Sequence, residues 1–260
     1  MSLYQTSLSL GLMHTKRVKT ALVMFFLGCA CLLYLPKEVH NVIWFVASSV
    51  AMYEWSCLGP YREKYKQIAW GTLVQFALWF FVARVPAADI LPNMSWVCSL
   101  TICNIIVLVC FANSALKSYH WLCGYLVQGV AWYLGYYFYS QYSHDWQIAV
   151  LLTILADVSG YLVGMQSSSS KRPWPFISPN KTYSGSLAMI IAPCLAGFLL
   201  DTKYFMWTVG AWSLLGDLFV SCAKRYAKQK DCGSLLPGHG GLLDRVDSHL
   251  AVWIGLFFAL

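Results

Sequence analysis

Three aspartates near the end of the chain have positions suited to binding a metal ion. Asp217 lies in the apolar run WSLLGDLFVSCAKR, and Asp244 and Asp247 are three residues apart in GLLDRVDSHL. Carboxylates gathered at one place repel one another unless a cation joins them, and oxygen ligands that leave room for water and phosphate suit Mg²⁺. We therefore expect Asp217, with Asp244 and Asp247, to form a Mg²⁺ site.

A basic, glycine-rich segment separates these aspartates. Lys224, Arg225, Lys228 and Lys230 precede GSLLPGHGG, which ends at Gly241. Glycines allow backbone N–H groups to turn toward an anion that approaches closely. Cations on one side and carboxylates on the other suit a metal-bound polyphosphate.

Four residues of this region also have structural explanations that involve neither metal nor phosphate. On a helix, Asp217 shares a face with Lys224 and Arg225, so a structural ion pair between them is an alternative. Asp244, with Asp247, could instead complement the dipole at the start of the last helix. His239 could be a base, a phosphate donor or a turn residue, and we favour a structural or hydrogen-bonding role because no second His or Cys has metal-ligand spacing with it.

The elements that must position these residues are predicted to be membrane helices. Of the 260 residues, 58% are hydrophobic and 11% charged, which is too apolar for a water-soluble globule of this size. Runs long enough to cross about 30 Å of hydrocarbon lie near 18–36, 41–58, 68–86, 96–116, 119–140, 146–166, 184–200, 204–222 and 247–260. We therefore expect an all-α, polytopic integral membrane protein of about nine transmembrane helices.

The basic residues predict the orientation of these helices. With a cytoplasmic N-terminus, 15 of the 18 Lys and Arg residues fall in cytoplasmic segments. The net charge of +7 is then a signature of orientation and requires no nucleic acid. The first apolar run is expected to be a retained helix rather than a signal peptide. We expect one domain over 1–260, with mainly structural spans in 1–145 and catalytic spans and loops in 146–260.

Two further acids lie inside expected spans. Asp157 falls in LLTILADVSGYLVG, and a carboxylate at mid-bilayer costs on the order of 3 kcal/mol, so it needs a partner. Glu54 lies near the inner end of its span, where a paired or functional role and simple snorkelling to the interface are both possible.

The same segments carry a family resemblance. SCAKR at 221–225, KD at 230–231, Gly233, LP at 236–237, HGG at 239–241 and DRxD at 244–247 resemble the signature of the phosphatidate cytidylyltransferase (CDP-diacylglycerol synthase) family. SPNKTYSG at 178–185, GDLFVS at 216–221 and Asp157, Tyr161 and Gly164 are similar to other segments of that family. Departures from its pattern are Asn180, Ser184, Val220, Ala223, Val158 and Ser159.

The resemblance implies transfer of CMP from CTP to phosphatidate, giving CDP-diacylglycerol and pyrophosphate. It implies a homodimer in a bacterial inner membrane, with the active site facing the cytoplasm. Asp217, Asp244, Lys224 and Arg225 would then be catalytic. Two Mg²⁺ ions are expected, with Asp217 and Asp244 as principal ligands and Asp247 and Asp231 as lesser candidates. The expected substrate-binding residues are Ser178, Lys181, Ser221, Lys230, Gly238, His239, Gly240, Gly241 and Arg245.

Three rival functions make different predictions. A cation-coupled transporter would place its carboxylates near mid-membrane in two related halves, and no such repeat is visible. A CTP-using polyprenol kinase would share the metal and nucleotide chemistry but release CDP. A noncatalytic scaffold leaves the signature unexplained.

Overall fold

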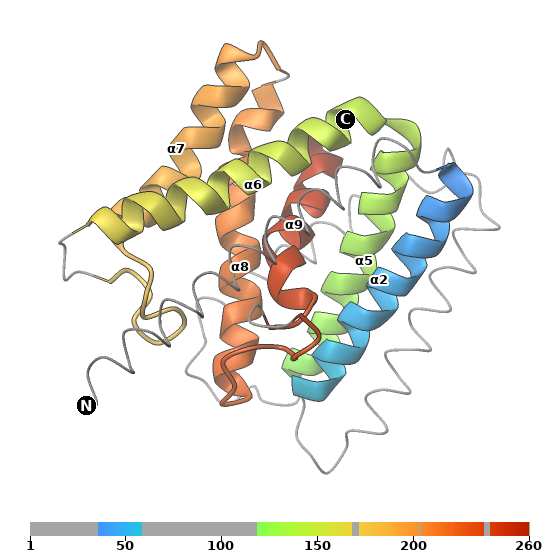
Figure 1. Ribbon diagram of the computed structural model, residues 1–260, viewed down its shortest axis with the longest axis horizontal. Coiled ribbons are helices and arrows are strands. Elements are labelled where there is room, and N and C mark those ends of the chain that lie inside the picture. The colour runs from blue at the N-terminus through green and yellow to red at the C-terminus, as the bar shows by residue number, and fades with distance from the viewer. Residues whose placement is uncertain (1–35, 59–118, 168–171, 203, 237–239, 260) are drawn as a thin grey trace, which may run out of the picture.

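The described part of the chain is helical. The computed structural model describes residues 36–58, 119–167, 172–202, 204–236 and 240–259 (Figure 1). Its elements are α2 (Lys37–Leu58), α5 (Tyr119–Gln141), α6 (Ser143–Gln166), α7 (Tyr183–Leu199), η2 (Tyr204–Thr208), α8 (Val209–Tyr226), α9 (Leu243–Leu256) and η3 (Phe257–Ala259). Within these ranges the only pairing of the β type is an isolated bridge between Leu236 and Gly240. The all-α class is therefore confirmed.

Six expected spans coincide with helices of the structure. The last helix begins at Leu243, four residues before the expected start, and α8 continues to Tyr226 rather than ending near residue 222. The spans expected near 68–86 and 96–116, and all but the end of the one near 18–36, fall outside the described residues. The count of nine and the cytoplasmic N-terminus stay predictions.

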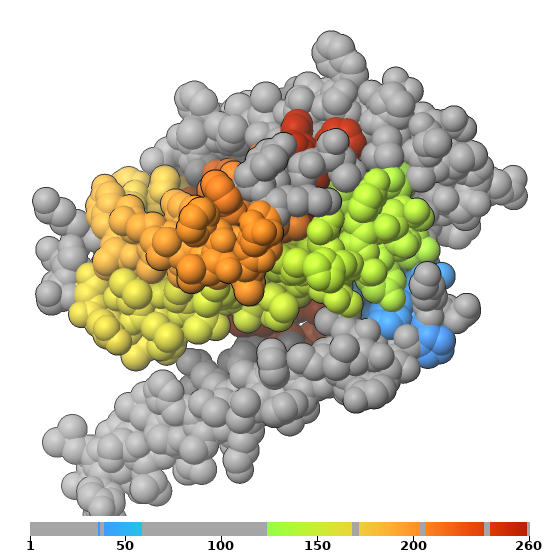
Figure 2. Space-filling model, turned by 90° about the horizontal axis from the view of Figure 1, so that it is seen from above, coloured from blue at the N-terminus to red at the C-terminus, as the bar shows by residue number. Residues whose placement is uncertain are grey.

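Two helical stretches of the described chain are long and apolar enough to cross a membrane. They are Ser143–Gln166 and Met206–Tyr226. The helix Tyr183–Leu199 is also apolar but shorter. Figure 2 shows α7 alongside the C-terminal part of α6, and both carry large exposed apolar side chains, including Leu151, Tyr161, Met165, Leu195 and Phe198. Such a surface agrees with the apolar composition of a membrane protein.

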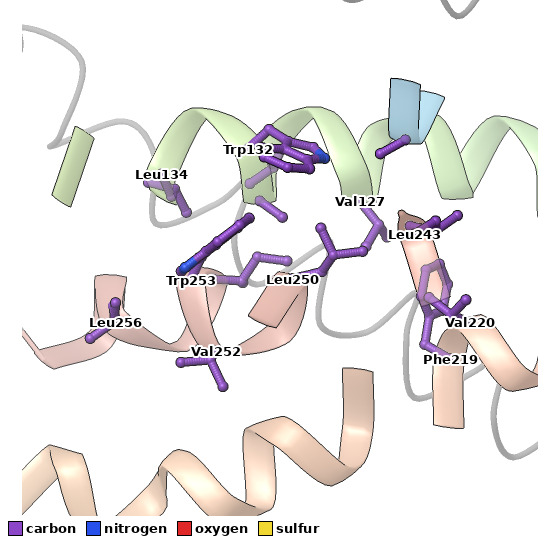
Figure 3. Close-up of a cluster of buried hydrophobic side chains, with 14 of the residues drawn as sticks. Val127, Trp132, Leu134, Phe219, Val220, Leu243, Leu250, Val252, Trp253 and Leu256 are labelled. Carbon is purple, nitrogen blue, oxygen red and sulfur yellow. The ribbon is translucent and has the colours of Figure 1, made fainter. Parts of the chain in front are cut away.

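The helix α9 lies at the centre of the bundle. It packs between α8 and α5, while α2 lies along α5 and α6 crosses over the bundle (Figure 1). Figure 3 shows Trp253 and Leu250 of α9 facing Trp132 of α5, and the Trp132 and Trp253 ring centroids are 5.1 Å apart. Because α9 contacts α8 on one side and α5 on the other, it helps to fix the end of α8 and the loop that leads from α8 to α9.

A glycine allows α8 and α9 to approach closely. A Cβ atom at Gly216 would overlap the backbone carbonyl oxygen of Asp247 and lie 3.0 Å from that of Ser248. Only a residue without a side chain permits this contact. The close crossing brings Asp217, the next residue along α8, to the side of α9 that carries Asp247.

Replacing Gly216 by Ala is therefore expected to destabilise the protein by about 1–3 kcal/mol, because the added methyl group overpacks the crossing. Thermal unfolding of the purified protein in detergent, followed by circular dichroism, measures the loss. Gly164→Ala in α6 is the matched control, since a Cβ there would lie an ordinary 3.5 Å from Thr182. An unchanged melting temperature for Gly216→Ala would contradict the close crossing.

Candidate active site

Asp217 forms an ion pair with a lysine that is distant in the sequence. Its Oδ2 atom lies 2.5 Å from Nζ of Lys181, and its Oδ1 accepts a hydrogen bond from Oγ of Ser221 at 3.1 Å. Lys181 belongs to the SPNKT segment just before α7, and its Nζ also lies 3.2 Å from Sδ of Met189. The pair thus joins that segment to α8.

A second ion pair joins the end of α8 to the start of α9. Nζ of Lys224 donates to Oδ1 of Asp244 at 2.8 Å, and the two side chains are only 11% and 4% exposed. The other oxygen of Asp244 accepts hydrogen bonds from the backbone N–H groups of Cys232, at 2.8 Å, and Gly241, at 2.9 Å. Asp244 therefore fixes both ends of the intervening loop.

These pairs correct one alternative drawn from helical spacing. Asp217 does not pair with Lys224 or Arg225, because residues seven or eight apart on a helix are separated by roughly 10–12 Å along its axis. Tertiary folding brings a nearer partner to each charge: Lys181 to Asp217 and Asp244 to Lys224. Asp244 does lie in the first turn of α9, as the helix-dipole alternative expects.

The environment of Asp244 favours its ionised form. Burial alone would raise the pKa of this carboxyl group, but the hydrogen bond and charge of Lys224, with the N–H groups of Gly241 and Cys232, lower the pKa below its ordinary value. Burial raises the pKa of the neighbouring Cys232 thiol. The thiol therefore stays protonated at neutral pH.

Asp157 also lies near Asp217 and Asp247, although it was not among the expected metal ligands. Its Oδ1 accepts from Oγ of Ser248 at 3.0 Å and from Oγ of Ser213 at 3.3 Å. Asp157, Asp217 and Asp247 lie close enough for their charges to interact. The signal in the sequence was a carboxylate in an apolar span, which needs polar partners; the sequence could not say which.

The described residues fit a magnesium site only in part. Within the described ranges, no three His, Cys, Asp or Glu side chains are already arranged to hold a metal ion. Both oxygens of Asp244 are engaged by Lys224 and the backbone. Asp217, Asp247 and Asp157 together offer only oxygen donors, the kind that Mg²⁺ prefers. Asp231 is exposed and lies beside Gly240.

The glycine-rich loop depends on Gly240. Its φ angle is +85°, in the left-handed region that favours glycine, and its carbonyl oxygen accepts from the N–H of Leu236 at 2.8 Å. A Cβ atom at Gly240 would also lie 2.7 Å from Oδ2 of Asp244. Gly238 and His239, both predicted to bind substrate, lie outside the described residues.

The remaining predicted residues lie around these pairs. The guanidinium of Arg225 donates through Nε to the carbonyl oxygen of Ile177 at 3.1 Å, so α8 contacts the segment that contains Ser178. Lys230 and Arg245 are exposed. The structure thus brings the SPNKT segment, the end of α8 and the start of α9 together.

Glu54 is a residue of this region that the expected site did not include. It is 4% exposed, and its Oε1 and Oε2 accept hydrogen bonds from the N–H groups of Leu242, at 2.9 Å, and Leu243, at 2.7 Å. The snorkelling alternative is therefore wrong, and the paired one is confirmed. The signal in the sequence was an acidic residue near the end of a span. Its backbone partners could not be identified, because they lie almost 190 residues further along the chain.

The geometry defines a class of protein: a helical bundle in which one buried lysine–aspartate pair, with backbone hydrogen bonds, holds a basic, glycine-rich loop at one end. Comparison with known proteins gives the family. The model of the Cytidylyltransferase family matches residues 15–260, and the chain belongs to this family.

The chain is similar to curated relatives named phosphatidate cytidylyltransferase. The protein of Staphylococcus epidermidis is 36% identical over 130 residues, which cover 45% of this chain and 50% of the relative. That of Staphylococcus haemolyticus is 37% identical over the same length, and that of Staphylococcus aureus is 36% identical over 135 residues, or 48% of this chain and 52% of the relative. The chain spans about half the length of these relatives. No solved structure matches it.

Removing the positive charge of the Lys224–Asp244 ion pair should destabilise the fold. Lys224→Met leaves the buried Asp244 carboxylate without its counter-charge, and we expect a loss of about 3 kcal/mol in the free energy of unfolding. Lys230→Met is the matched control, because Lys230 is exposed and its loss should change stability by about 0.5 kcal/mol or less. Unfolding curves in detergent compare the two; equal stabilities would refute the structural importance of the pair.

Proposed function

We propose that this chain transfers CMP from CTP to phosphatidate, giving CDP-diacylglycerol and pyrophosphate. The observation that carries the proposal is that α8 bears two lysine–aspartate pairs: Asp217 pairs with Lys181 of the SPNKT segment, and Lys224 pairs with Asp244, which binds the glycine-rich loop. The family and the names of the curated relatives support it. In the reaction, a phosphate oxygen of phosphatidate bonds to the α-phosphorus of CTP, and the bond from that phosphorus to the bridging oxygen of the β-phosphate breaks.

The chief obstacle to this reaction is that an anion must approach an anion. The phosphatidate oxygen is already negatively charged near neutral pH, so the step needs no strong general base. Fixed cations that neutralise charge and align the reacting groups lower the barrier. Lys181 and Lys224, held in place by their carboxylates, and Arg225 at the end of α8 are the residues that supply these charges.

The acids would hold magnesium. We assign Asp217 as the principal ligand, with Asp247 and Asp157 beside it, because their charges interact and their donors are all oxygen. Asp244 was expected from the sequence to be the other principal ligand. Because Lys224 and the loop backbone engage both of its oxygens, we propose that it contributes to catalysis through them. When bound, Mg²⁺ would neutralise phosphate charge and orient the leaving group. Two ions remain the expected number.

The proposed substrates explain a membrane location. Phosphatidate keeps its acyl chains in the bilayer while CTP arrives from water, so a site at the cytoplasmic boundary can serve both. We propose nine transmembrane helices, a cytoplasmic N-terminus, a homodimer and a bacterial inner membrane. The excess of Lys and Arg in the segments assigned to the cytoplasm supports the orientation.

The test is a turnover assay with purified protein in detergent, CTP, phosphatidate and Mg²⁺. Asp217→Asn should reduce formation of CDP-diacylglycerol about 100-fold or more, because it weakens both the Lys181 pair and the proposed metal site. Asp201→Asn is the matched control, since Asp201 is exposed and its φ angle of 49° is one that Asn adopts readily. Equal rates for the two variants would contradict the assignment of Asp217.

Metal removal gives an independent prediction. Chelation of divalent cations should abolish product formation, and added Mg²⁺ should restore it, whereas added Ca²⁺ should restore it poorly because Ca²⁺ prefers a larger and more flexible set of oxygen ligands. The melting temperature, measured in parallel, should change little, because Asp244 holds the loop through Lys224 and backbone N–H groups without metal. Full activity in the presence of the chelator would contradict the magnesium proposal.

A further inference from the structure

The carboxylate of Glu54 is enclosed by the glycine-rich loop. Besides accepting the N–H groups of Leu242 and Leu243, it lies against two glycines at opposite ends of that loop. A Cβ atom at Gly233 would lie 2.8 Å from Oε1 of Glu54, and one at Gly241 would lie 2.5 Å from Oε2. Both ends of the loop backbone therefore pack against the Glu54 side chain.

Glu54 and Asp244 hold neighbouring parts of the same backbone. Asp244 binds the N–H groups of Cys232 and Gly241, and Glu54 binds those of the two residues that follow Gly241. The charges of the two carboxylates interact, so they lie near each other across the loop. Two buried acids thus fix the path on which Gly233 and Gly241 lie.

The helix α2 is itself anchored next to Glu54. The ring of Trp55 stacks on Phe219 of α8, with centroids 5.5 Å apart and planes 11° apart. The hydroxyl of Ser56 lies 2.6 Å from that of Tyr125 in α5. Glu54 is consequently presented by a helix that both neighbours hold in place.

We propose that Glu54 is a positioning residue for the transfer reaction, acting through the loop and the start of α9 on Lys224 and Asp244 without touching substrate. This inference rests on the proposed function. A carboxylate is suited to the role because both of its oxygens accept hydrogen bonds and it complements the positive end of the α9 dipole. The N-terminal half of the chain then contributes directly to the geometry of the site.

Glu54→Gln tests the role with little change of shape. The amide keeps one acceptor but turns a donor toward one of the two backbone N–H groups. We expect the Michaelis constant for CTP to rise and kcat/KM to fall about 10- to 100-fold, as is typical when a supporting group is removed. Ser56→Ala is the matched control: it removes a buried hydrogen bond of α2 to α5 and leaves the loop untouched.

Hydrogen exchange tests the anchor separately from the reaction. In Glu54→Gln, amides in the 232–243 segment should exchange faster than in the unmodified protein, and in Ser56→Ala they should not. Unchanged exchange in Glu54→Gln would overturn the proposal whatever the activity. Faster exchange with an unchanged KM for CTP would also overturn it, because loss of folded protein alone lowers kcat and leaves KM the same. If the unmodified protein makes no CDP-diacylglycerol, the proposed function fails, and so does a positioning role in that reaction.

A double-mutant cycle tests separately whether Gly233 acts through Glu54, and its first variant leaves the Glu54 carboxylate in place. Gly233→Ala should disturb the loop by pushing on the Glu54 carboxylate, so it should lower kcat/KM for CTP about tenfold in the unmodified protein and have almost no further effect in Glu54→Ala. Effects that simply multiply would show that Gly233 does not act through Glu54, and would overturn the inference.

Discussion

Burial of charge at one end of a helical bundle is the constraint on which this structure depends. A carboxylate in a low-dielectric interior costs several kcal/mol unless a cation or several N–H groups compensate it. Asp244 is compensated by Lys224 and two backbone N–H groups, Asp217 by Lys181, and Glu54 by the start of α9. Each compensation joins elements that are distant in the sequence, so the charges determine how the loops fold.

Under the proposed function, the same pairs would prepare the site for phosphate chemistry. Lys181 and Lys224 are already held by carboxylates, so little side-chain freedom is lost when an anion arrives. Under the proposed function, phosphates compete for the lysines and Mg²⁺ competes for the aspartates. The close α8–α9 crossing at Gly216 and the left-handed Gly240 keep the two sets of charges adjacent.

The sequence predicted the elements better than their partners. Long apolar runs were sufficient to predict α2, α5, α6, α7, α8 and α9, because a helix buried in a bundle or bilayer needs only length and hydrophobicity. Helical spacing suggested a pair between Asp217 and Lys224, whereas the structure pairs each with another residue. Local periodicity carries no information about which distant segment folds against a face.

The two acids in apolar spans show the same limit of sequence reasoning. Asp157 and Glu54 were recognised as costly and in need of partners, but Ser248, Ser213 and the backbone of α9 are tertiary neighbours that spacing does not reveal. The motifs of the family signature that the structure describes come together at the end of α8 and the start of α9. The number of spans, their orientation and the metal ligands stay predictions.

The fate of the phosphates of CTP tests the central claim most directly. Purified protein would be given phosphatidate, Mg²⁺ and CTP labelled either at the α-phosphate or at the γ-phosphate, and the label would be followed into the lipid and into pyrophosphate. The account predicts that the α-label enters the lipid and the γ-label leaves in pyrophosphate. Transfer of the γ-label to lipid, with release of CDP, would show a kinase and contradict the account.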